Sequence, residues 1–569
     1  MRYLALATDY DGTLATQGRI APETFASLER LRGSGRRVIL VTGRRFDDLK
    51  TVCPHLDPFD AVVAENGAVL HWPATRETAV LGPAPPPRFL QRLKERRVTP
   101  LAVGAVVVAT AHPNETAVIQ VIHELALELQ IVFNRDEVMV LPPGINKGTG
   151  LQAALARLGL SPHEVVAIGD SANDHSLLQL CECAAATAEA PDSLKGVADF
   201  TTRGGAGAAV RELVDELVET DLAGRSTGGQ GAEVALGLRE DGSVVTFKPY
   251  GHNLLIAGPS ASGKSTFATG LIERLTQRSY QLCVIDPEGD YGTLSDLVTL
   301  GSRLRAPHIE EILAVLEDPA TNLVVNLLGV SLADRPDFFA ELFPSLLALR
   351  ARTGRPHWIL IDEVHHLLPS EWSIAPALLP QRLGETIMIT VHPMHVAAPI
   401  LRHVDVAVAV GPRPESTLAE LAAAIHQPLP RITPRPPARG EVVVWDMKDE
   451  SDPARLKVIP ARAQRLRHLR KYAEGNVGPR SFFFRGPDAR LNLRAQNLVT
   501  FCELGMGVDE ATWLFHLRAG DYSRWLRDVI KDPDLAREVA AVEREQMSAD
   551  QSRRLVRDAI DQRYTLPGG

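Results

Sequence analysis

The sequence has little of several features that would mark particular classes of protein. Its five cysteines are an odd number, lie far apart in the chain or lack CxxC spacing, and so indicate neither a disulfide framework nor a zinc site. No apolar run approaches the roughly 20 residues that cross a bilayer. The first residues lack the basic start, apolar core and cleavage site of a signal peptide. We therefore expect a cytoplasmic protein with no membrane partner.

A net positive charge is also missing. The formal charge of -9 gives no overall attraction to nucleic acid. Only residues 462–494 are locally basic, with about nine basic residues to two acidic ones, and aromatic residues lie among them. This composition is compatible with phosphate contact and base stacking. The alternative, which we favour, is that Phe482 to Phe484 pack into a small core or a subunit interface.

The 569 residues are too many for one ordinary core and suggest three or four domains. Strand-like and helix-like segments alternate from the start, as in YLALAT, TFASLERLRGSG and RVILVTGR, which predicts a parallel α/β sheet. The pattern predicts an α/β protein with four parts: residues 1–222 with a small inserted α/β cap at about 75–141, a linker at 223–232, a second α/β domain at 233–460, and a helical region at 461–569. Within the cap, AVGAVVVATA is read as one strand.

The first motif, TDYDGTL, places Asp9 at the carboxyl end of a buried strand and brings Asp11 back to the same site after one residue. Open α/β sheets place their ligands at this edge. Asp9 is positioned to attack phosphorus, while Asp11 can protonate the leaving oxygen and later deprotonate water. Two carboxylates beside a dianionic substrate need a cation, so the pattern predicts Mg²⁺.

Three further segments support this interpretation. The strand VILVTGR ends in Thr42 and Gly43, a hydroxyl and a backbone N–H able to hold a phosphoryl oxygen. Lys147 opens a helix and offers a positive charge. The strand VVAIGD ends in Asp170, and the carboxylates available to the metal are completed by the segment that follows, which contains Asn173 and Asp174.

Together these four segments resemble the haloacid dehalogenase-like phosphatases, and their order and spacing resemble the Cof-type branch, over about residues 1–220. The resemblance implies a Rossmann-like domain in which Asp9 is the nucleophile and Asp11 the acid/base. It also implies that Thr42 and Lys147 bind the phosphoryl group and that Asp170 completes the Mg²⁺ shell together with Asp9 and Asp11. Asp174 is a possible further ligand. The short cap favours a small phosphorylated substrate, such as a sugar phosphate or phosphoglycolate.

The second motif, GPSASGKST, fits the P-loop pattern GxxxxGK[ST], follows the strand NLLIAG and precedes a helix-like segment. The backbone of such a loop wraps the phosphates of ATP, Lys264 reaches the β and γ oxygens, and Ser265 binds Mg²⁺. The expected nucleotide-binding residues are Gly258, Ser260, Ser262, Gly263, Lys264, Ser265 and Thr266.

Further along, the strand in WILIDEVHH ends in two acids. Asp362 is placed to hold Mg²⁺ through water, and Glu363 to activate the attacking water, which suits hydrolysis better than transfer. The strand TIMITVHPMH places Thr390 and His392 where a sensor of the γ-phosphate would lie. Between the P-loop and this strand, VIDPEGDY is another strand that ends in acids.

The combination of GPSASGKST, VIDPEGDY and IDEVHH resembles the HerA/FtsK-like ATPases, specifically the HerA branch, over about residues 232–450. The resemblance implies a RecA-like domain and a homo-oligomer, with a hexamer expected and a neighbour's arginine completing each site. Four arginines are candidates for that role: Arg352, Arg355, Arg402 and Arg413. Only about 65 residues separate DPEGDY from the next acidic strand, which leaves little room for insertions that grip DNA.

The leading hypothesis is a bifunctional enzyme, a Mg²⁺-dependent phosphatase fused to a HerA-like ATPase. One alternative is an enzyme that processes nucleic-acid ends or translocates DNA in repair or phage defence. Another is a nucleotide-controlled assembly scaffold. The cap, which would obstruct a strand end, and Glu363 after Asp362 argue against end processing.

Overall fold

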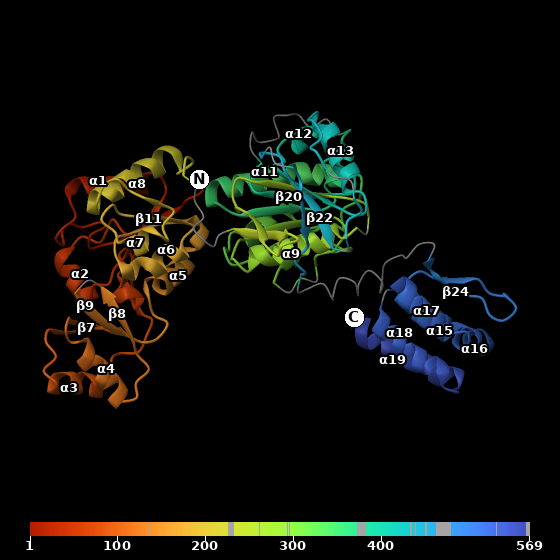
Figure 1. Cartoon of the computed structure of the whole chain (residues 1–569), viewed down its shortest axis with the longest axis horizontal. Coiled ribbons are helices and arrows are strands. Elements are labelled where there is room, and N and C mark those ends of the chain that lie inside the picture. The colour runs from red at the N-terminus through yellow and green to blue at the C-terminus, as the bar shows by residue number, and fades with distance from the viewer. Residues whose placement is uncertain are drawn as a thin grey trace. The chain divides into compact units, whose positions relative to one another are not determined.

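Two large sheets and one small sheet form within residues 1–459 of the computed structural model, and a separate helical unit follows (Figure 1). The chain divides into the units Met1–Ile459 and Pro460–Gly569. The structure describes residues 1–134, 136–225, 233–260, 262–292, 294, 296–371, 383–432, 435–438, 440–449, 452–461, 480–530 and 532–564. Most of the predicted linker and residues 462–479 of the basic segment lie outside these residues.

The first sheet is an eight-stranded α/β sheet, as the alternating pattern predicts. Its strands lie in the order β12-β11-β10-β1-β2-β3-β4-β5, with parallel pairing from β12 to β3 and antiparallel pairing beyond. The strands are β1 (Ala5–Asp9), β2 (Arg37–Val41), β3 (Ala61–Ala64), β4 (Val69–Trp72), β5 (Glu77–Val80), β10 (Val165–Gly169), β11 (Cys183–Ala186) and β12 (Phe200–Thr201).

Helices cover both faces of this sheet, which explains why the central strands β1 and β10 are buried at every position. One face packs against α1 (Pro22–Gly33), α2 (Phe46–Val52) and α8 (Ala206–Thr220). The other packs against α5 (Lys147–Leu158), α6 (His175–Leu180) and α7 (Asp192–Lys195). Ligand-binding loops can therefore emerge only at the strand ends.

The cap is a four-stranded antiparallel sheet with two helices on one face. The strand order is β6-β7-β9-β8, from β6 (Leu101–Val103), β7 (Val108–Ala111), β8 (Gln130–Asn134) and β9 (Glu137–Leu141). The helices α3 (Pro87–Glu95) and α4 (Glu115–Glu124) pack on the face away from the first sheet (Figure 1). The opposite face packs against Ala68 of the first sheet's domain.

The segment AVGAVVVATA is not one strand, so that prediction was wrong. It forms β6 and β7, which pair antiparallel across a turn at residues 104–107. In this turn the N–H of Gly104 donates to the Val107 carbonyl at 2.8 Å. The other N–H groups of the turn bond to a carboxylate from outside the cap, a long-range contact that local sequence cannot reveal.

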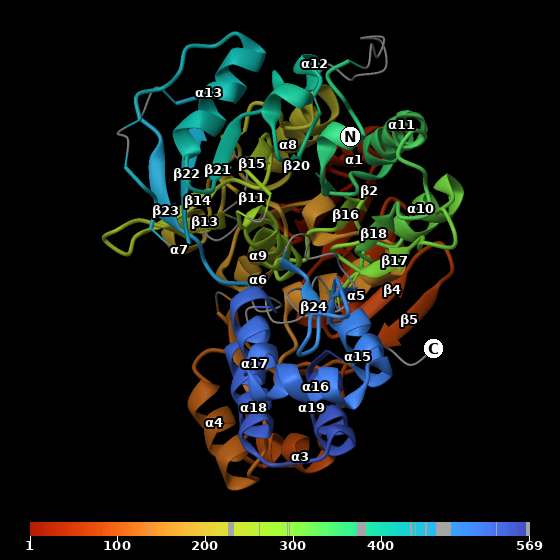
Figure 2. The same cartoon turned by 90° about the vertical axis from the view of Figure 1, so that its right-hand side faces the viewer.

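The second large sheet has eleven strands in the order β14-β13-β23-β22-β21-β15-β20-β19-β16-β18-β17. The seven from β21 to β17 are parallel, and Figure 2 shows β21, β15 and β20 side by side. The strands are β13 (Val234–Leu238), β14 (Val244–Phe247), β15 (Asn253–Ala257), β16 (Leu282–Asp286), β17 (Val298–Leu300), β18 (Leu323–Asn326), β19 (Trp358–Ile361), β20 (Thr386–Thr390), β21 (Val406–Val410), β22 (Glu441–Asp446) and β23 (Ala454–Lys457).

Helices again cover both faces of this sheet. On one face lies α9 (Lys264–Thr276). The other face carries α10 (Ile309–Leu316), α11 (Arg335–Thr353), α12 (Ala398–Leu401) and α13 (Pro414–Ile425). β13 and β14 pair antiparallel across a turn at Asp241 and Gly242.

The carboxyl-terminal unit is mainly helical, as predicted. It contains α15 (Leu498–Gly507), α16 (Glu510–Arg518), α17 (Asp521–Trp525), a π-helical turn (Leu526–Ile530), α18 (Pro533–Arg544), α19 (Ala549–Tyr564) and a short hairpin of β24 (Phe482–Phe484) and β25 (Leu493–Ala495). Phe482 and Phe484 are buried among Phe501, Trp513 and Tyr522. The preferred interpretation as core residues is confirmed for Phe482 and Phe484, whereas Phe483 is half-buried.

Among the described residues, no helix combines the length and the apolar character that a membrane span requires.

Phe484→Ala is expected to destabilise the carboxyl-terminal unit by about 3–5 kcal/mol, because the ring is fully buried and its removal leaves a cavity. Hydrogen-exchange mass spectrometry should show faster exchange throughout α15 to α19 and no change in residues 1–225. Phe515→Ala is the control, because that ring is 40% exposed. Equal exchange in the two variants would contradict the assigned core.

Candidate active sites

Three carboxylates from two parts of the chain meet at the carboxyl edge of the first sheet. Asp9 ends β1, Asp170 directly follows β10, and these two strands pair side by side in parallel. Asp174 lies in the short 3-10 turn Ala172–Asp174 that follows. All three residues are buried, and they offer oxygen atoms that lie within 4.8 Å of one another. This edge therefore concentrates negative charge at one buried point.

Lys147 supplies the positive charge at this point. It is the first residue of α5, whose start is fixed by a capping box between Asn146 and Thr149. Its Nζ donates to Asp9 Oδ1 and to Asp174 Oδ1, both at 2.6 Å, and the side chain is 1% exposed. The other oxygen of Asp174 accepts the N–H groups of Asp170 and Ser171. The ammonium group thus joins the first motif to the last.

Burial and charge perturb both partners of this pair. Burial raises the pKa of Asp9 well above its ordinary value, and the neighbouring Asp174 carboxylate raises it further against the opposing effect of Lys147. Burial lowers the pKa of Lys147, but the charges of Asp174 and Asp9 outweigh it, so that the pKa is raised. Lys147 is therefore cationic at neutral pH, and a further cation would favour ionised Asp9.

Thr42 and Gly43 follow β2 at the same edge, as expected. Thr42 is buried, and the Nδ2 of Asn173 lies 3.5 Å from the position of a Cβ built on Gly43. Asn173 also donates to Asn66 Oδ1 at 3.5 Å. The second and fourth motifs are therefore in contact, and Met139 of the cap also lies against Gly43, with its Sδ 3.5 Å from the same Cβ position.

Asp11 lies apart from the three clustered carboxylates. Its side chain forms a two-pronged ion pair with Arg44, with Nε to Oδ2 at 2.5 Å and Nη2 to Oδ1 at 2.7 Å. Both side chains are about one-third exposed. Glu137 of β9 is also close, since the charges of Arg44 and Asp11 act on its pKa, which burial raises. Asp11 therefore faces the space between the first sheet and the cap.

Sequence reasoning missed Arg44, Glu65, Glu137 and Met139. Arg44 follows the predicted Thr42 and Gly43, and Glu65 follows β3, so the strand-end argument used for Asp9 also applies to them. Glu137 and Met139 are two residues apart on β9 and share the face toward the site. No local signal distinguishes them from other cap residues. Arg135, between β8 and β9, lies outside the described residues.

The second candidate site is the loop between β15 and α9, the predicted P-loop. Gly258 and Gly263 have φ values of 152° and 105°, and a Cβ on Gly258 would lie 1.9 Å from the Val410 carbonyl oxygen. Lys264 is buried, and its Nζ donates to the carbonyls of Gly258 and Pro259 at 2.9 and 3.1 Å. Of the other expected nucleotide-binding residues, Ser260 is exposed, whereas Ser262, Ser265 and Thr266 are half-buried.

The two predicted acids follow β19, which is separated from the P-loop strand β15 by β20. Asp362 is buried, and Glu363 has a left-handed backbone with φ of 41°. Burial raises the pKa of Glu363, and the nearby charge of Lys264 partly opposes this effect. Glu363, the predicted base, is thus close enough to Lys264 for the charge of the lysine to act on its pKa. The raised pKa of Glu363 suits proton abstraction.

Two other predicted segments have local structural roles. Asp286, the first acid of DPEGDY, accepts hydrogen bonds from the backbone N–H groups of Gly289, Asp290 and Tyr291 and so shapes the turn after β16.

Thr390, at the end of β20, has its Oγ1 3.1 Å from Nδ1 of His365. Burial and neighbouring histidines lower the pKa of His365 to about 4. His392 lies 3.5 Å from Glu420.

Of the four candidate arginines, Arg355 has a buried partner within the same chain. Its Nε lies 2.7 Å from Glu164 Oε1, and both side chains are at most 5% exposed. Arg355 is therefore a poor candidate for an arginine that reaches into a neighbour's site. Arg352 pairs with Glu317 on the surface, whereas Arg402 and Arg413 are exposed.

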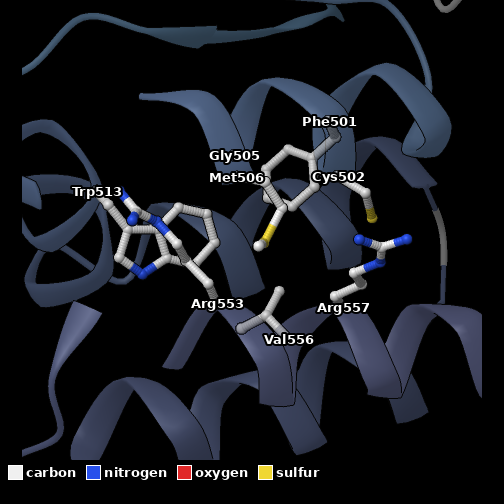
Figure 3. Close-up of a pocket in the computed structure, with 8 residues that line it drawn as sticks. All are labelled: Phe501, Cys502, Gly505, Met506, Trp513, Arg553, Val556 and Arg557. Atoms are coloured by element: carbon white, nitrogen blue, oxygen red, sulfur yellow. The ribbon is translucent and has the colours of Figure 1, made fainter. Parts of the chain in front are cut away.

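The carboxyl-terminal unit contains one small pocket beside Trp513 and Arg553 (Figure 3). Its volume of about 10 Å³ is room for about one water molecule. Arg553 donates to the Val508 carbonyl and to Asp550, so its charge serves the fold of this unit. The pocket offers no place for a substrate.

The residues present fit the two groups that the motifs imply. Mg²⁺ prefers carboxylate oxygens, and Asp9, Asp170 and Asp174 supply three of them at one buried point with one lysine between two of them. At the P-loop, the buried Oγ of Ser262 has no hydrogen-bond partner among the described residues. A loop that offers an unpaired hydroxyl, and whose glycines allow a ligand to approach the backbone closely, is suited to binding a chain of phosphates.

Comparison with known proteins matches both parts of the chain. The family described as haloacid dehalogenase-like hydrolase matches residues 6–84 and 103–212, and the family described as the central domain of helicase HerA matches residues 250–346. A phosphoglycolate phosphatase of Halorubrum lacusprofundi is 32% identical over 207 residues, which are 34% of this chain and 88% of the relative.

Two further similarities cover the same region. A phosphoglycolate phosphatase of Methanothermobacter thermautotrophicus is 27% identical over 218 residues, which are 37% of this chain and 96% of the relative. A crystal structure of a Thermoplasma acidophilum protein has 18% identity and a TM-score of 0.34, and covers 38% of this chain and 98% of that chain.

Lys147→Met is expected to destabilise the first sheet's domain by about 3–5 kcal/mol, because it leaves buried carboxylates without their ammonium partner. Calorimetry should show a melting transition lowered by roughly 10 °C, with partial recovery when Mg²⁺ is added. Lys50→Met, which removes an exposed lysine, is the control. Equal melting temperatures of both variants would refute the assigned charge balance.

Proposed function

The chain belongs to the haloacid dehalogenase-like hydrolases through residues 6–212, and from this premise we propose that it is a Mg²⁺-dependent phosphatase for a small phosphate ester. We propose in addition that its HerA-like domain hydrolyses ATP. The observation that carries the first proposal is the contact of Lys147 with both Asp9 and Asp174 beside Asp170.

In the first proposed step, a carboxylate oxygen of Asp9 attacks phosphorus, and the bond from phosphorus to the ester oxygen breaks. Asp11 gives its proton to the leaving oxygen. Thr42 and Lys147 hold the phosphoryl oxygens, and the buried position of Asp9 excludes water from competing attack. Mg²⁺, held by Asp9, Asp170 and Asp174, would neutralise the charge that gathers here.

In the second step, Asp11 takes a proton from water, the water oxygen attacks phosphorus, and the bond to Asp9 breaks to release phosphate. Asp11 can serve both steps because it lies in the space shared with the cap. Arg44 orients its carboxylate through two hydrogen bonds. We propose that this pair loosens when Asp11 turns toward the leaving group.

The proposed substrate is a compact ester such as 2-phosphoglycolate or a sugar phosphate. Met139 of the cap lies against Gly43, and Glu137 on the same strand is near enough to Arg44 for its charge to act on the Glu137 pKa, so we take the cap to favour a compact ester over a polymer end. The relatives named phosphoglycolate phosphatases support a small carboxylate-bearing ester, and Arg44 and Arg45 place positive charge near the site for such a group.

For the second domain, the proposed roles are those of the motif. Lys264 and the backbone of the P-loop bind the phosphates of ATP, with Gly258 and Gly263 permitting the close approach. Ser265 and Asp362 would hold Mg²⁺, and Glu363 takes the proton of the attacking water. We further propose a cytoplasmic homo-oligomer, with a hexameric ring as the expected form.

A second candidate function is nucleic-acid processing, which the similarity to the HerA central domain favours. In this alternative the phosphatase acts on 3′-phosphorylated ends and the ATPase moves DNA. A third is a nucleotide-controlled scaffold, marked by slow turnover and assembly that depends on ATP. A panel of small esters and 3′-phosphorylated DNA separates the phosphatase from the nucleic-acid alternative, whereas oligomerisation that depends on ATP distinguishes the scaffold.

Asp9→Asn is expected to abolish phosphate release from 2-phosphoglycolate and sugar phosphates, because an amide is a far weaker nucleophile than a carboxylate. The assay compares these esters with 3′-phosphorylated DNA, with Mg²⁺ and with EDTA, and EDTA should stop all turnover. Asp47→Asn changes an exposed aspartate and is the matched control. Release confined to DNA ends would replace the small-ester proposal with the nucleic-acid alternative.

Lys264→Ala is expected to lower ATP hydrolysis by at least about 100-fold while phosphate-ester turnover remains, because Lys264 is the P-loop cation. Asp9→Asn should show the opposite pattern, so that each variant is the control for the other. Coupled phosphate assays on both substrates measure this. ATP turnover that survives in Lys264→Ala would exclude the P-loop as the hydrolytic site.

A further inference from the structure

The side chain of Glu65 links the first sheet's domain to the cap. Glu65 directly follows β3, and its Oε1 accepts the N–H of Ala105 at 2.9 Å. Its Oε2 accepts the N–H groups of Val106 and Val107 at 2.9 and 3.0 Å. One carboxylate thus satisfies three successive backbone donors of the turn at residues 104–107, which we call the cap turn.

The cap turn is shaped around this carboxylate. Glu65 is 2% exposed, and a Cβ on Gly104 would lie 2.5 Å from its Oε1, so only glycine fits there. Glu65 itself has a φ of 51°, a left-handed conformation that costs a glutamate of the order of 1 kcal/mol. Burying an acid in a strained backbone conformation costs free energy, even with three charge-assisted hydrogen bonds. Surrounding contacts must therefore hold Glu65 in this conformation.

Residues 65–67 also contact the segments proposed to bind phosphate. The N–H of Glu65 donates to the Arg44 carbonyl at 2.9 Å, and the N–H of Asn66 donates to the Thr42 carbonyl at 3.0 Å. Gly67, with φ of 108°, packs so closely that a Cβ would lie 2.0 Å from the carbonyl oxygen of Asn146, the residue before Lys147. Residues 65–67 therefore lie between the second motif and the start of α5.

The cap turn is equally close to the cap surface that covers the site. It joins β6 to β7, and β7 pairs with β9 in a register that places Ala109 opposite Met139. Met139 covers Gly43, and Glu137 on the same strand faces Arg44 and Asp11. A shift of the cap turn would thus move the cap residues that meet the substrate.

We propose that Glu65 is a positioning residue that latches the cap over the phosphatase site and thereby sets which esters are accepted. This inference rests on the proposed phosphatase function. Glu65 acts through the cap turn and touches no reacting atom. The phosphoryl transfer itself remains the task of Asp9, Asp11 and Lys147.

An apolar cluster also joins the cap to the first domain, and it is the competing explanation for the cap's position. It comprises Ala68, Val106, Val107, Ala109, Met139 and Leu141. Apolar contacts are non-directional and permit sliding, whereas three hydrogen bonds to one carboxylate fix an orientation. The two explanations therefore differ in what happens when only the carboxylate is removed.

The test compares Glu65→Gly with Arg76→Gly in the full-length protein. Glycine accepts the left-handed backbone at both positions, so neither variant adds strain, and Arg76 has a φ of 59° in an exposed turn without a role in the cap. Glu65→Gln is a partial variant, because one amide oxygen can still accept two of the three N–H groups. The measurements are hydrogen exchange and steady-state kinetics with 2-phosphoglycolate and p-nitrophenyl phosphate.

In Glu65→Gly the amides of Ala105, Val106 and Val107 should exchange faster, with those of β1 unchanged. The ratio of kcat/KM for 2-phosphoglycolate to that for p-nitrophenyl phosphate should fall on the order of tenfold, mainly through KM for 2-phosphoglycolate. Glu65→Gln should lie between this variant and wild type, and Arg76→Gly should match wild type. If the role of Glu65 were purely structural, kcat/KM would fall by the same factor for both substrates.

If hydrogen exchange at the cap turn is unchanged in Glu65→Gly, Glu65 does not hold the cap in place, whatever the kinetics show. Faster exchange with an unchanged substrate ratio would overturn the positioning role. If wild type hydrolyses neither ester, the proposed phosphatase function fails and the positioning role fails with it, whereas the exchange result still decides whether Glu65 holds the cap. The two failures are thus distinguishable.

Discussion

The first domain depends on the hydrogen bonds that the ammonium group of Lys147 donates to two buried carboxylates. The ammonium group binds Asp9 and Asp174 at equal distances, so the first and last motifs are held at one point although they are far apart in sequence. Three buried carboxylates would repel one another without a cation. One lysine cannot neutralise three carboxylates, so the arrangement fits the Mg²⁺ of the proposed function.

Both large sheets use the same geometric rule. Parallel strands deliver their carboxyl ends to a single edge, and each sheet carries its acids and its lysine there: Asp9, Asp170 and Lys147 in one, and Asp362, Glu363 and Lys264 in the other. In each case the lysine begins a helix, where backbone N–H groups add to the positive field. The chain thus repeats one arrangement of acids and a lysine on two unrelated motifs.

The sequence was sufficient to predict those features that depend on local pattern. The strand-end positions of Asp9, Thr42, Asp170 and Asp362, and the helix start at Lys147, follow from short segments with clear periodicity. Local pattern did not predict the pairing of Asp11 with Arg44 or the folding of AVGAVVVATA into a hairpin. Both depend on partners 30 or more residues away in the sequence. Asp286 shows the converse, since an acid at a strand end proved to bind its own turn.

The central claim is that Asp9 becomes phosphorylated during turnover. The most direct measurement is an acid quench of the enzyme with Mg²⁺ and 2-phosphoglycolate, followed by mass spectrometry of the peptide that contains Asp9. The account predicts a phosphate on the Asp9 side chain in wild type, and no phosphorylated peptide in Asp9→Asn. Phosphate release without any modification of that peptide would contradict the account, since water would then attack the substrate directly.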